Sequence, residues 1–269
     1  MKFLLDIKKF IHSIYEKRDA IYELTKRDFE AQYKSTYLGV LWGFIHPLTY
    51  ILVLLIVFTF GLRTNPGNDI PFVIYLISGM IPWQFISGTF ISLTNVVRQH
   101  SYLVRKGDLS LSILHVAKIL SSLLTLFVLI VICMIICAFY GYHLGFHSLQ
   151  ILYYTLSMCI LLLGLGWITS ATSIFVEDVA NIVNIFIQFG FWFTPIIWNL
   201  NRIPKQYQWI AKLNPTCYLI TGFRDSLVYK TPFWAKPQET VYFWLVTLIV
   251  LLAGVIIFRR LKPHFGEVI

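Results

Sequence analysis

Apolar residues are gathered into six long runs along the chain. The runs cover residues 38–62, 70–93, 118–140, 149–175, 179–200 and 241–258. A helix needs about 20 mostly apolar residues to cross the hydrocarbon core of a bilayer, and each run is close to that length. The pattern therefore predicts an all-α polytopic membrane protein with six transmembrane helices.

The distribution of basic residues predicts which side of the membrane each end occupies. An even number of spans places both ends on one side, and short cytoplasmic segments are enriched in Lys and Arg. With both ends inside, the inner segments hold 14 of the 22 Lys and Arg residues and the outer segments hold seven. We therefore expect a multi-pass protein of the cytoplasmic (inner) membrane with cytoplasmic N- and C-termini.

The residues before the first run are amphipathic. From Phe3 to Ile21, apolar side chains recur at helical spacing, and most lysines lie off that face. Such a helix can lie in the headgroup region. Thr25 and Asp28 resemble a capping box, which predicts a second helix starting there. Residues 1–37 are thus predicted to form cytoplasmic interface helices, either receiving a partner protein or acting as an anchor, and residues 38–269 the transmembrane domain.

Two of the runs carry polar side chains as an ordered stripe. The stripe of the fifth run consists of Asn181, Asn184, Gln188 and Trp192. At 100° per residue these positions lie within about 80° of one another around a helix. The second run carries a similar cluster of Gln84, Ser87, Gly88 and Asn95. Polar residues in a membrane face a bundle interior or water, so the stripes either line a polar pathway or hydrogen-bond between helices.

Acidic residues are absent from the middle of every run. Lys118 lies at the end of the third run, where a lysine can extend its ammonium group to the headgroups. A carrier coupled to protons or sodium usually has an ionisable residue near the bilayer midplane. We therefore expect the energy for any transport to come from a source other than ion coupling.

Residues 201–240, between the fifth and sixth runs, predict a pair of short amphipathic helices separated at Asn214-Pro215. Both are too short to cross a membrane, so they are expected to form a re-entrant or interfacial cover over the outer mouth. Aromatic residues are dense here and at the outer ends of the runs. They form either the aromatic belt of a membrane protein or a track on which sugar rings stack.

Composition excludes several other classes of protein. Only 13% of residues are charged, about half the share in soluble domains, which is about 25%. The net charge of +9 is explained by basic residues beside the spans, so no nucleic-acid partner is expected. The four cysteines form no CxxC pair and indicate no redox site.

Catalytic and nucleotide-binding motifs are missing from the sequence. The chain contains no GxxxxGK[ST], HExxH, GxSxG or DxD pattern, so it has no P-loop of its own. His143 and His147 have helical ligand spacing, but they lie in a short glycine-containing loop, and no metal site is expected. We predict a non-catalytic subunit without a cofactor of its own.

Several segments, in their order and spacing, resemble the membrane subunit of ABC-2-type exporters for polysaccharides and polyol-phosphate polymers. They read YKSTYLGVLWGFIHP, LISGMIPWQF, VEDVANIV, FTPIIW, IPKQYQWIAKLNP and LKPHFGEVI. The resemblance covers nearly the whole chain. Members of this family export O-antigen chains, capsule or wall teichoic acid.

The resemblance implies a homodimer of six-span subunits, with two copies of a separate cytoplasmic ABC ATPase that carries ATP and Mg²⁺. The substrate is a polymer whose lipid anchor stays with the membrane lipids. The loop between spans two and three and the turn between spans four and five would meet the ATPase. The positions for this contact are Arg98, Tyr102, Arg105, Lys106, Asp108, Glu177 and Asp178.

Channel-lining and gate residues follow from the stripes and the same resemblance. The expected channel residues are Asn181, Asn184, Gln188, Phe189, Trp192, Gln84 and Tyr50. The expected residues of the outer gate helices are Tyr207, Trp209, Asn214, Arg224 and Asp225. If the polymer is rich in phosphate, the outer basic residues Arg202, Lys205, Lys212 and Arg224 could attract it.

Two rival functions remain open from the sequence. An ABC-2 permease for drugs or lipids would need no sugar polymer, and small amphiphiles would stimulate its ATPase. An intramembrane glycosyl- or acyltransferase would act as a purified single chain. The missing catalytic groups count against the second rival.

Overall fold

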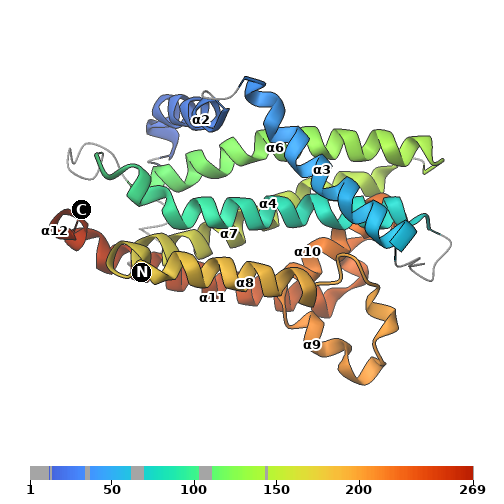
Figure 1. Cartoon of the computed structure of the whole chain (residues 1–269). Helices are drawn as coiled ribbons and strands as arrows, with labels where there is room; N and C mark the ends of the chain where they lie inside the picture. The colour runs from blue at the N-terminus through green and yellow to red at the C-terminus, as the bar shows by residue number, and fades with distance from the viewer. Residues whose placement is uncertain are drawn as a thin grey trace.

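The chain folds into a bundle of long helices with one surface helix crossing it. The computed structural model describes His12 and residues 14–33, 37–61, 70–102, 111–142 and 145–268, and every element in this part of the chain is helical. Five helices there are long and apolar enough to cross a membrane. All but the first run side by side along a common direction, and the first slopes across them (Figure 1).

The five spans coincide with predicted runs, but several of the helices extend beyond the predicted ends. The first is α3 (Trp42–Ile56) with a 3₁₀ turn before it, η1 (Gly39–Leu41), and a π-helical turn after it, η2 (Val57–Gly61). The others are α4 (Phe72–Gln99), α6 (Ser112–Phe139), η3 (Phe146–Leu149) with α7 (Gln150–Phe175), and α11 (Pro237–Leu261) with η8 (Lys262–His264). The short α12 (Phe265–Val268) follows η8.

The fifth predicted run contains a shorter helix than expected. The prediction of a helix to residue 200 is wrong, because α8 (Asp178–Phe193) has 16 residues and ends where Thr194 becomes extended, with φ −90° and ψ 139°. Thr194 precedes Pro195, and the proline ring disfavours helical geometry in the residue before it. At 1.5 Å per residue α8 is about 24 Å long, less than the roughly 30 Å of a hydrocarbon core. A sixth crossing therefore stays a prediction.

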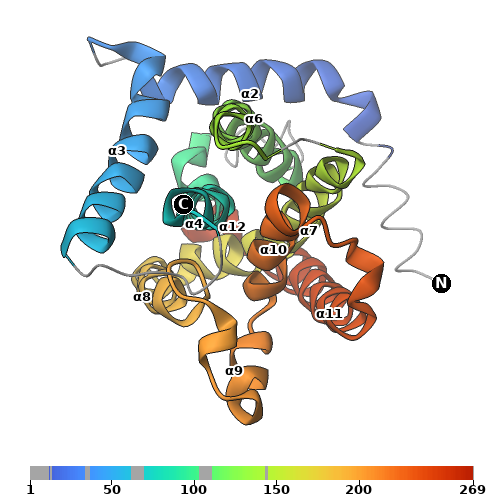
Figure 2. The ribbon, with the colours of Figure 1, turned by 90° about the vertical axis from the view of Figure 1, so that its right-hand side faces the viewer.

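Helix α4 lies at the centre of the bundle and contacts α3, α6, α7, α8 and α10. Of its most apolar 18 residues 72% are buried, compared with 11% in α3. Figure 2 views the bundle along its length and shows α3 at the edge, beside neither α7 nor α11. A single chain thus leaves most of α3 uncovered.

Two glycines allow α7 and α11 to approach each other closely. A Cβ atom at Gly254 would lie 2.6 Å from the carbonyl oxygen of Gly164, and one at Gly164 would lie 2.9 Å from the Cα atom of Leu251. Small residues permit such backbone contact between membrane helices. These glycines therefore fix the spacing of the two helices.

Replacing Gly254 by alanine should destabilise the protein, because the backbone of α7 cannot rotate away as a side chain could. Overpacking of this kind costs about 1–3 kcal/mol. The measurement is the thermal unfolding of the purified protein in detergent. Gly266→Ala is the control, since a Cβ atom there meets nothing within 4 Å. Equal melting temperatures of the two variants would contradict the close contact.

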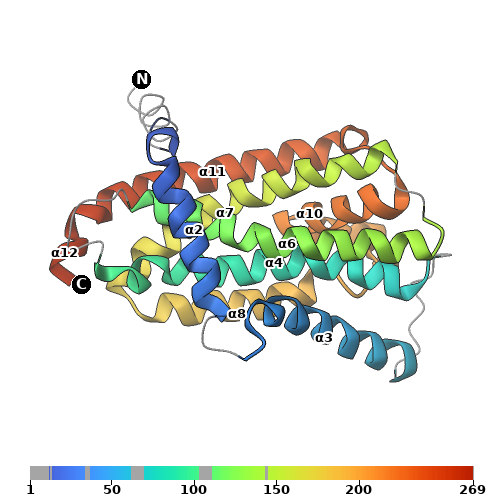
Figure 3. The same ribbon diagram turned by 90° about the horizontal axis from the view of Figure 1, so that it is seen from above.

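The surface helix α2 (Arg18–Tyr33) packs across α6, as Figure 3 shows from above. It is continuous, so the predicted helix start at Thr25 is wrong: the Thr25 hydroxyl donates to the Ile21 carbonyl inside the helix, at 2.7 Å. Ile21 is buried and packs near Ile113 and Ala117. The apolar residues predicted before position 12 lie outside the described residues.

The opposite end of the bundle carries the short elements between α8 and α11. Two of them are the expected short helices, α9 (Gln208–Lys212) and α10 (Pro215–Arg224). The others are η4 (Leu200–Arg202), η5 (Lys205–Tyr207), η6 (Asp225–Tyr229) and η7 (Phe233–Ala235). Asn214 separates α9 from α10 and caps α10, since its side-chain oxygen accepts from the Thr216 N–H. Their role as a gate stays a prediction.

Candidate functional site

A cavity of about 440 Å³ lies between α3, α4 and α8. Its lining residues are Tyr50, Trp83, Gln84, Ser87, Ile187, Gln188, Phe191 and Trp192. Four of the seven predicted channel residues are among them, namely Tyr50, Gln84, Gln188 and Trp192. Within the described part of the chain, no Asp, Glu, Lys or Arg lines it. The structure thus brings amide and aromatic side chains from three separate helices into one uncharged hollow.

Aromatic rings form most of the wall of this cavity. Phe191 is central, with its ring centroid 6.4 Å from Tyr50, 6.0 Å from Trp83 and 5.3 Å from Trp192. Gly190 lets the Trp83 ring lie against α8, because a Cβ atom there would be 2.9 Å from that ring. Tilted and edge-on ring pairs at these separations are favourable, so the wall is held in place by α3, α4 and α8 together.

The remaining channel candidates lie on the open side of α8. Asn181, Asn184 and Phe189 are exposed, and Phe189 is 62% exposed. The amide groups of Asn181, Asn184 and Gln188 make no side-chain hydrogen bond within the described part of the chain. An unpaired amide in hydrocarbon is costly. This face therefore requires water, a polar ligand or another protein surface.

A second cavity, of about 450 Å³, adjoins the first. Tyr50, Gln84, Ser87 and Ile187 line both, and the second continues between α4 and α6. The Gln84 side-chain nitrogen donates to the Pro47 carbonyl of α3 at 3.2 Å. Gln84 therefore sits at the junction of the two cavities and connects α3 to α4.

Arg224, at the end of α10, connects several elements at the end of the bundle that carries α9 and α10. Its side chain is buried and donates to the carbonyls of Tyr75, Pro195 and Ile196. Its guanidinium carbon lies 3.8 Å from the centroid of the Tyr75 ring. Burial lowers the pKa of Arg224 from its ordinary value, and the nearby Tyr75 opposes this shift. The arginine thereby satisfies the backbone of the extended segment after α8.

Gly79 makes room for this arginine. A Cβ atom at Gly79 would lie 2.3 Å from Arg224 Nη2 and 3.3 Å from the Ile196 carbonyl oxygen. Extended backbone at membrane depth must find its hydrogen bonds inside the protein. Here a buried charge supplies them. The suggestion that Arg224 attracts a phosphate-rich polymer is therefore wrong, because each of its three nitrogens already donates to a carbonyl and its side chain is buried.

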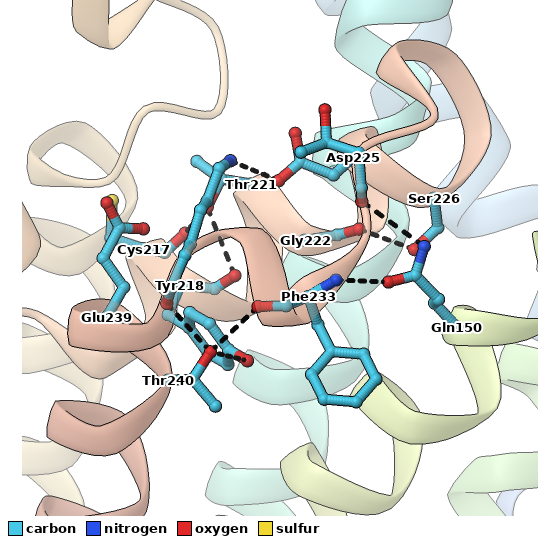
Figure 4. Close-up of polar contacts among 12 residues, drawn as sticks. Gln150, Cys217, Tyr218, Thr221, Gly222, Asp225, Ser226, Phe233, Glu239 and Thr240 are labelled. Atoms are coloured by element: carbon cyan, nitrogen blue, oxygen red, sulfur yellow. Dashed lines mark hydrogen bonds and ion pairs between the residues drawn. The ribbon is translucent and has the colours of Figure 1, made fainter. Parts of the chain in front are cut away.

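The chain beyond Arg224 is bound to α7 and α11 (Figure 4). Asp225 pairs with Lys236, and the Gln150 side-chain oxygen accepts from the Phe233 N–H at 2.6 Å. Tyr218 and Thr240 hydroxyls are 3.0 Å apart. Burial raises the pKa of the Asp225 carboxyl, and Lys236 opposes that shift. Two of the predicted gate residues, Arg224 and Asp225, thus lie inside the packed end of the bundle.

The other gate candidates lie on the surface of this end of the bundle or between its short helices. Tyr207 and Trp209 are exposed, whereas Asn214 caps α10 and its side-chain nitrogen donates to the Thr194 hydroxyl at 3.0 Å. Lys212 pairs with Glu239 at 2.8 Å. Asn214 therefore connects α10 to the end of α8, close to the segment that Arg224 holds.

The described candidates for ATPase contact lie near the end of α4 and the start of α8, at the end of the bundle that carries α2 and α12 (Figure 1). Arg98 of α4 and Glu177, just before α8, form an ion pair of 3.2 Å with Glu177 largely exposed. Asp178 begins α8 and Tyr102 is exposed. Arg105, Lys106 and Asp108 lie outside the described residues. The structure brings the two chain segments together at Arg98 and Glu177.

The sequence interpretation missed an ion pair between α2 and α6. Lys118 does not extend to solvent as predicted: its side chain is 7% exposed and its ammonium lies 2.7 Å from the Asp28 carboxylate, which is 13% exposed. A lone lysine within an apolar run was the available signal, since a buried charge requires a partner. The partner could not be chosen from spacing, because it is 90 residues away.

Comparison with known proteins places these features in a family context. The model of the ABC-2 type transporter family matches residues 19–228. An O-antigen export system permease protein RfbA of Klebsiella pneumoniae is 24% identical over 253 residues, covering 93% of this chain and 95% of its own length. The RfbA permease of Myxococcus xanthus is 22% identical over 261 residues, covering 96% and 98% respectively.

A polysialic acid transport protein is similar as well. The polysialic acid transport protein KpsM of Escherichia coli is 23% identical over 235 residues, which are 87% of this chain and 90% of that protein. The similarity to all three relatives thus extends over nearly their full lengths. Since the family match covers most of the chain, from α2 through α10 and into η6, the protein belongs to the ABC-2 type transporter family.

Proposed function

We propose that this chain is the non-catalytic permease subunit of an ATP-driven exporter that moves a lipid-linked polysaccharide or teichoic acid across the cytoplasmic membrane. Two copies form a homodimeric channel, and two cytoplasmic ABC ATPase subunits bind ATP and Mg²⁺ and supply the energy. The relatives' roles in O-antigen export and polysialic acid transport support the substrate class.

The observation that carries this proposal is the open, amide-bearing face of α8 beside the uncovered α3. Asn181, Asn184 and Gln188 require polar surroundings, although α8 belongs to a membrane bundle. A second copy of the chain facing α3 and α8 would enclose that face and turn it into the wall of a wet channel. Covering α3 would at the same time bury its apolar side chains.

The chemistry of this wall favours a neutral, hydroxyl-rich cargo. The cavity beside α8 contains amides, a serine hydroxyl and aromatic rings, and none of the described residues that line it is Asp, Glu, Lys or Arg. Amides exchange hydrogen bonds with sugar hydroxyls, and ring faces pack on the C–H faces of pyranoses. The lipid anchor is too apolar for such a channel and stays in the bilayer.

The other end of the bundle supplies the surface for the ATPase. Exposed Glu177 and Tyr102 lie near α2 and α12 there, with Arg98 tied to Glu177. Movement of a bound ATPase at this surface would reach α4 and α8, whose opposite parts line the cavity. The termini are cytoplasmic in this arrangement.

A cysteine-labelling experiment on the complete transporter in membranes tests the channel wall. Asn184→Cys should react with a charged, membrane-impermeant maleimide, because a thiol must ionise in water to react. Ile249→Cys on α11, which is 64% exposed, is the matched control and should face lipid without reacting. Equal labelling at both positions, or none at position 184, would contradict a wet channel along α8.

Substrate dependence separates this function from a permease for drugs or lipids. Polymer export should require both this chain and the ATPase, and the ATPase of the purified complex should respond to the polymer. Stimulation by small amphiphiles with no effect of the polymer would support the rival permease instead. Turnover by the purified chain alone would point to an enzyme.

A further inference from the structure

The cavity between α4 and α6 is lined by more hydrogen-bonding groups than its place in an apolar bundle explains. Its wall carries the phenol of Tyr50, the amide of Gln84, the imidazole of His46 and five aliphatic hydroxyls, namely those of Ser87, Thr89, Ser92, Ser122 and Thr125. Apolar side chains such as Phe85, Leu126 and Leu129 complete the wall. Its volume of about 450 Å³ falls in the usual range of small-molecule sites, about 300–1,000 Å³.

Two of these polar groups are incompletely satisfied. Gln84 Oε1 and Thr89 Oγ1 are buried and have no hydrogen-bond partner within the described residues. Buried polar groups in native proteins almost always have a hydrogen-bond partner, so a buried group without one within the protein calls for water or a ligand. Gln84 Oε1 is purely an acceptor. What completes this site must therefore include a hydrogen-bond donor.

The charge of the lining residues narrows the ligand further. No Asp, Glu, Lys or Arg among the described residues lines the cavity, and His46 is its one imidazole there, so no permanently charged side chain recognises a phosphate or a carboxylate. An acyl or isoprenoid chain fits the apolar wall but offers no donor to Gln84. A sugar ring offers hydroxyl donors at its rim and C–H groups on its faces.

We propose that this cavity is a side pocket of the channel that holds one uncharged sugar residue of the exported chain. The inference rests on the proposed function and adds the class of sugar that the permease accommodates. Tyr50, Gln84, Ser87 and Ile187 line both cavities, so a polymer passing along α8 reaches the pocket without a separate entrance. Of these four shared residues, Gln84 is the one whose amide binds sugar hydroxyls.

Substitutions of Gly88 can test this pocket. It lines the cavity, and a Cβ atom there meets nothing within 4 Å. Its substitution by alanine favours the helix, so Gly88→Ala serves as the control. Gly88→Leu fills the pocket and should lower polymer export about 10- to 200-fold, the range over which a few carbon atoms in a pocket change rates. The amount of the Gly88→Leu protein in the membrane should equal that of the Gly88→Ala protein.

Gly88→Cys in the complete transporter identifies the occupant. With polymer synthesis switched off, the thiol should react with a water-soluble maleimide, and with synthesis on, the polymer should protect it. Equal reaction in both states would show that the pocket holds water only. No reaction with the water-soluble maleimide in either state would show that the pocket holds lipid, because a thiol in lipid does not ionise. Either result overturns the proposal, as does normal export by Gly88→Leu.

These outcomes are distinguishable from failure of the proposed function. If the unmodified transporter exports no sugar polymer, the function itself is wrong. If export occurs and Asn184→Cys is labelled while the position 88 variants behave like wild type, the channel stands and only the side pocket is rejected.

Discussion

Replacing Arg224 by alanine is expected to destabilise the folded protein strongly. The carbonyls of Pro195 and Ile196 lose their donor, whereas the Tyr75 carbonyl keeps the Ser78 hydroxyl as a donor. Each buried polar group left without a partner costs about 1–3 kcal/mol. The sum is a large part of a typical folding free energy of about 5–15 kcal/mol. The measurement is the monodisperse peak and melting temperature after extraction in detergent.

Matched variants separate the role of Arg224 from the general effect of losing a charge. Lys205→Ala removes an exposed cation from the same end of the bundle and should leave the melting temperature unchanged. Arg224→Lys keeps the charge but presents a single ammonium in place of a planar fork. It should therefore be intermediate. A melting temperature of Arg224→Ala equal to that of Lys205→Ala would contradict the assignment.

A double-mutant cycle with Gly79 tests the contact itself. Gly79→Ala should be strongly destabilising in the native chain, because its Cβ atom would overlap Arg224 Nη2. When Arg224 is replaced by methionine, a flexible side chain that can adapt to the added methyl group, the added cost of Gly79→Ala should fall. Residues in contact show such coupling, whereas distant ones are additive. Additive effects would show that the arginine lies elsewhere.

Local patterns predicted the elements of this bundle well. The apolar runs mark α3, α4, α6, α7 and α11, since membrane crossing imposes a length that sequence alone displays. Asn214-Pro215 marked the start of α10, because an asparagine cap and a proline in the first turn are local devices. The end of α8 could also have been predicted locally, because Pro195 disfavours helical geometry at Thr194 and so ends the helix at Phe193.

Contacts between distant segments were not predictable in the same way. Arg224 was assigned to the outer gate because its short helix was expected to cover the outer mouth, where the family resemblance implies gate helices. Its burial depends on Gly79 and on the extended carbonyls after α8, neither of which the arginine's neighbours reveal. Lys118 and Asp28 likewise pair across 90 positions. In this protein, periodicity predicts helices, and the placement of buried charges follows from tertiary structure.

Removing either partner of the Asp28–Lys118 pair is expected to loosen α2 from the bundle. The ion pair is 2.7 Å long, and its side chains are 7% and 13% exposed. Asp28→Ala leaves a buried ammonium without its carboxylate, which costs about 3–5 kcal/mol when the remaining charge stays buried. The lysine can recover part of this by extending to the headgroups. We therefore expect a lower melting temperature and faster proteolysis within α2.

Removing both charges together should cost much less than removing one. In the double variant Asp28→Leu with Lys118→Met, apolar side chains of similar size replace the pair, and such replacements are often neutral or stabilising. Glu23 and Arg27 form an exposed pair on the same helix, 2.9 Å apart. Glu23→Ala is therefore the matched control, and its effect should stay within about 1 kcal/mol. A double variant as unstable as Asp28→Ala would contradict a role based on charge.

The same variants show whether α2 transmits motion or only anchors the chain. If α2 couples the ATPase to the channel, a loosened α2 should let the complete transporter hydrolyse more ATP for each polymer exported. The double variant, whose α2 stays docked on α6, should keep the native ratio. Measuring hydrolysis and export together decides the question, because an anchor alone would lower the amount of transporter in the membrane without changing the ratio. A native ratio in Asp28→Ala would therefore assign α2 to anchoring.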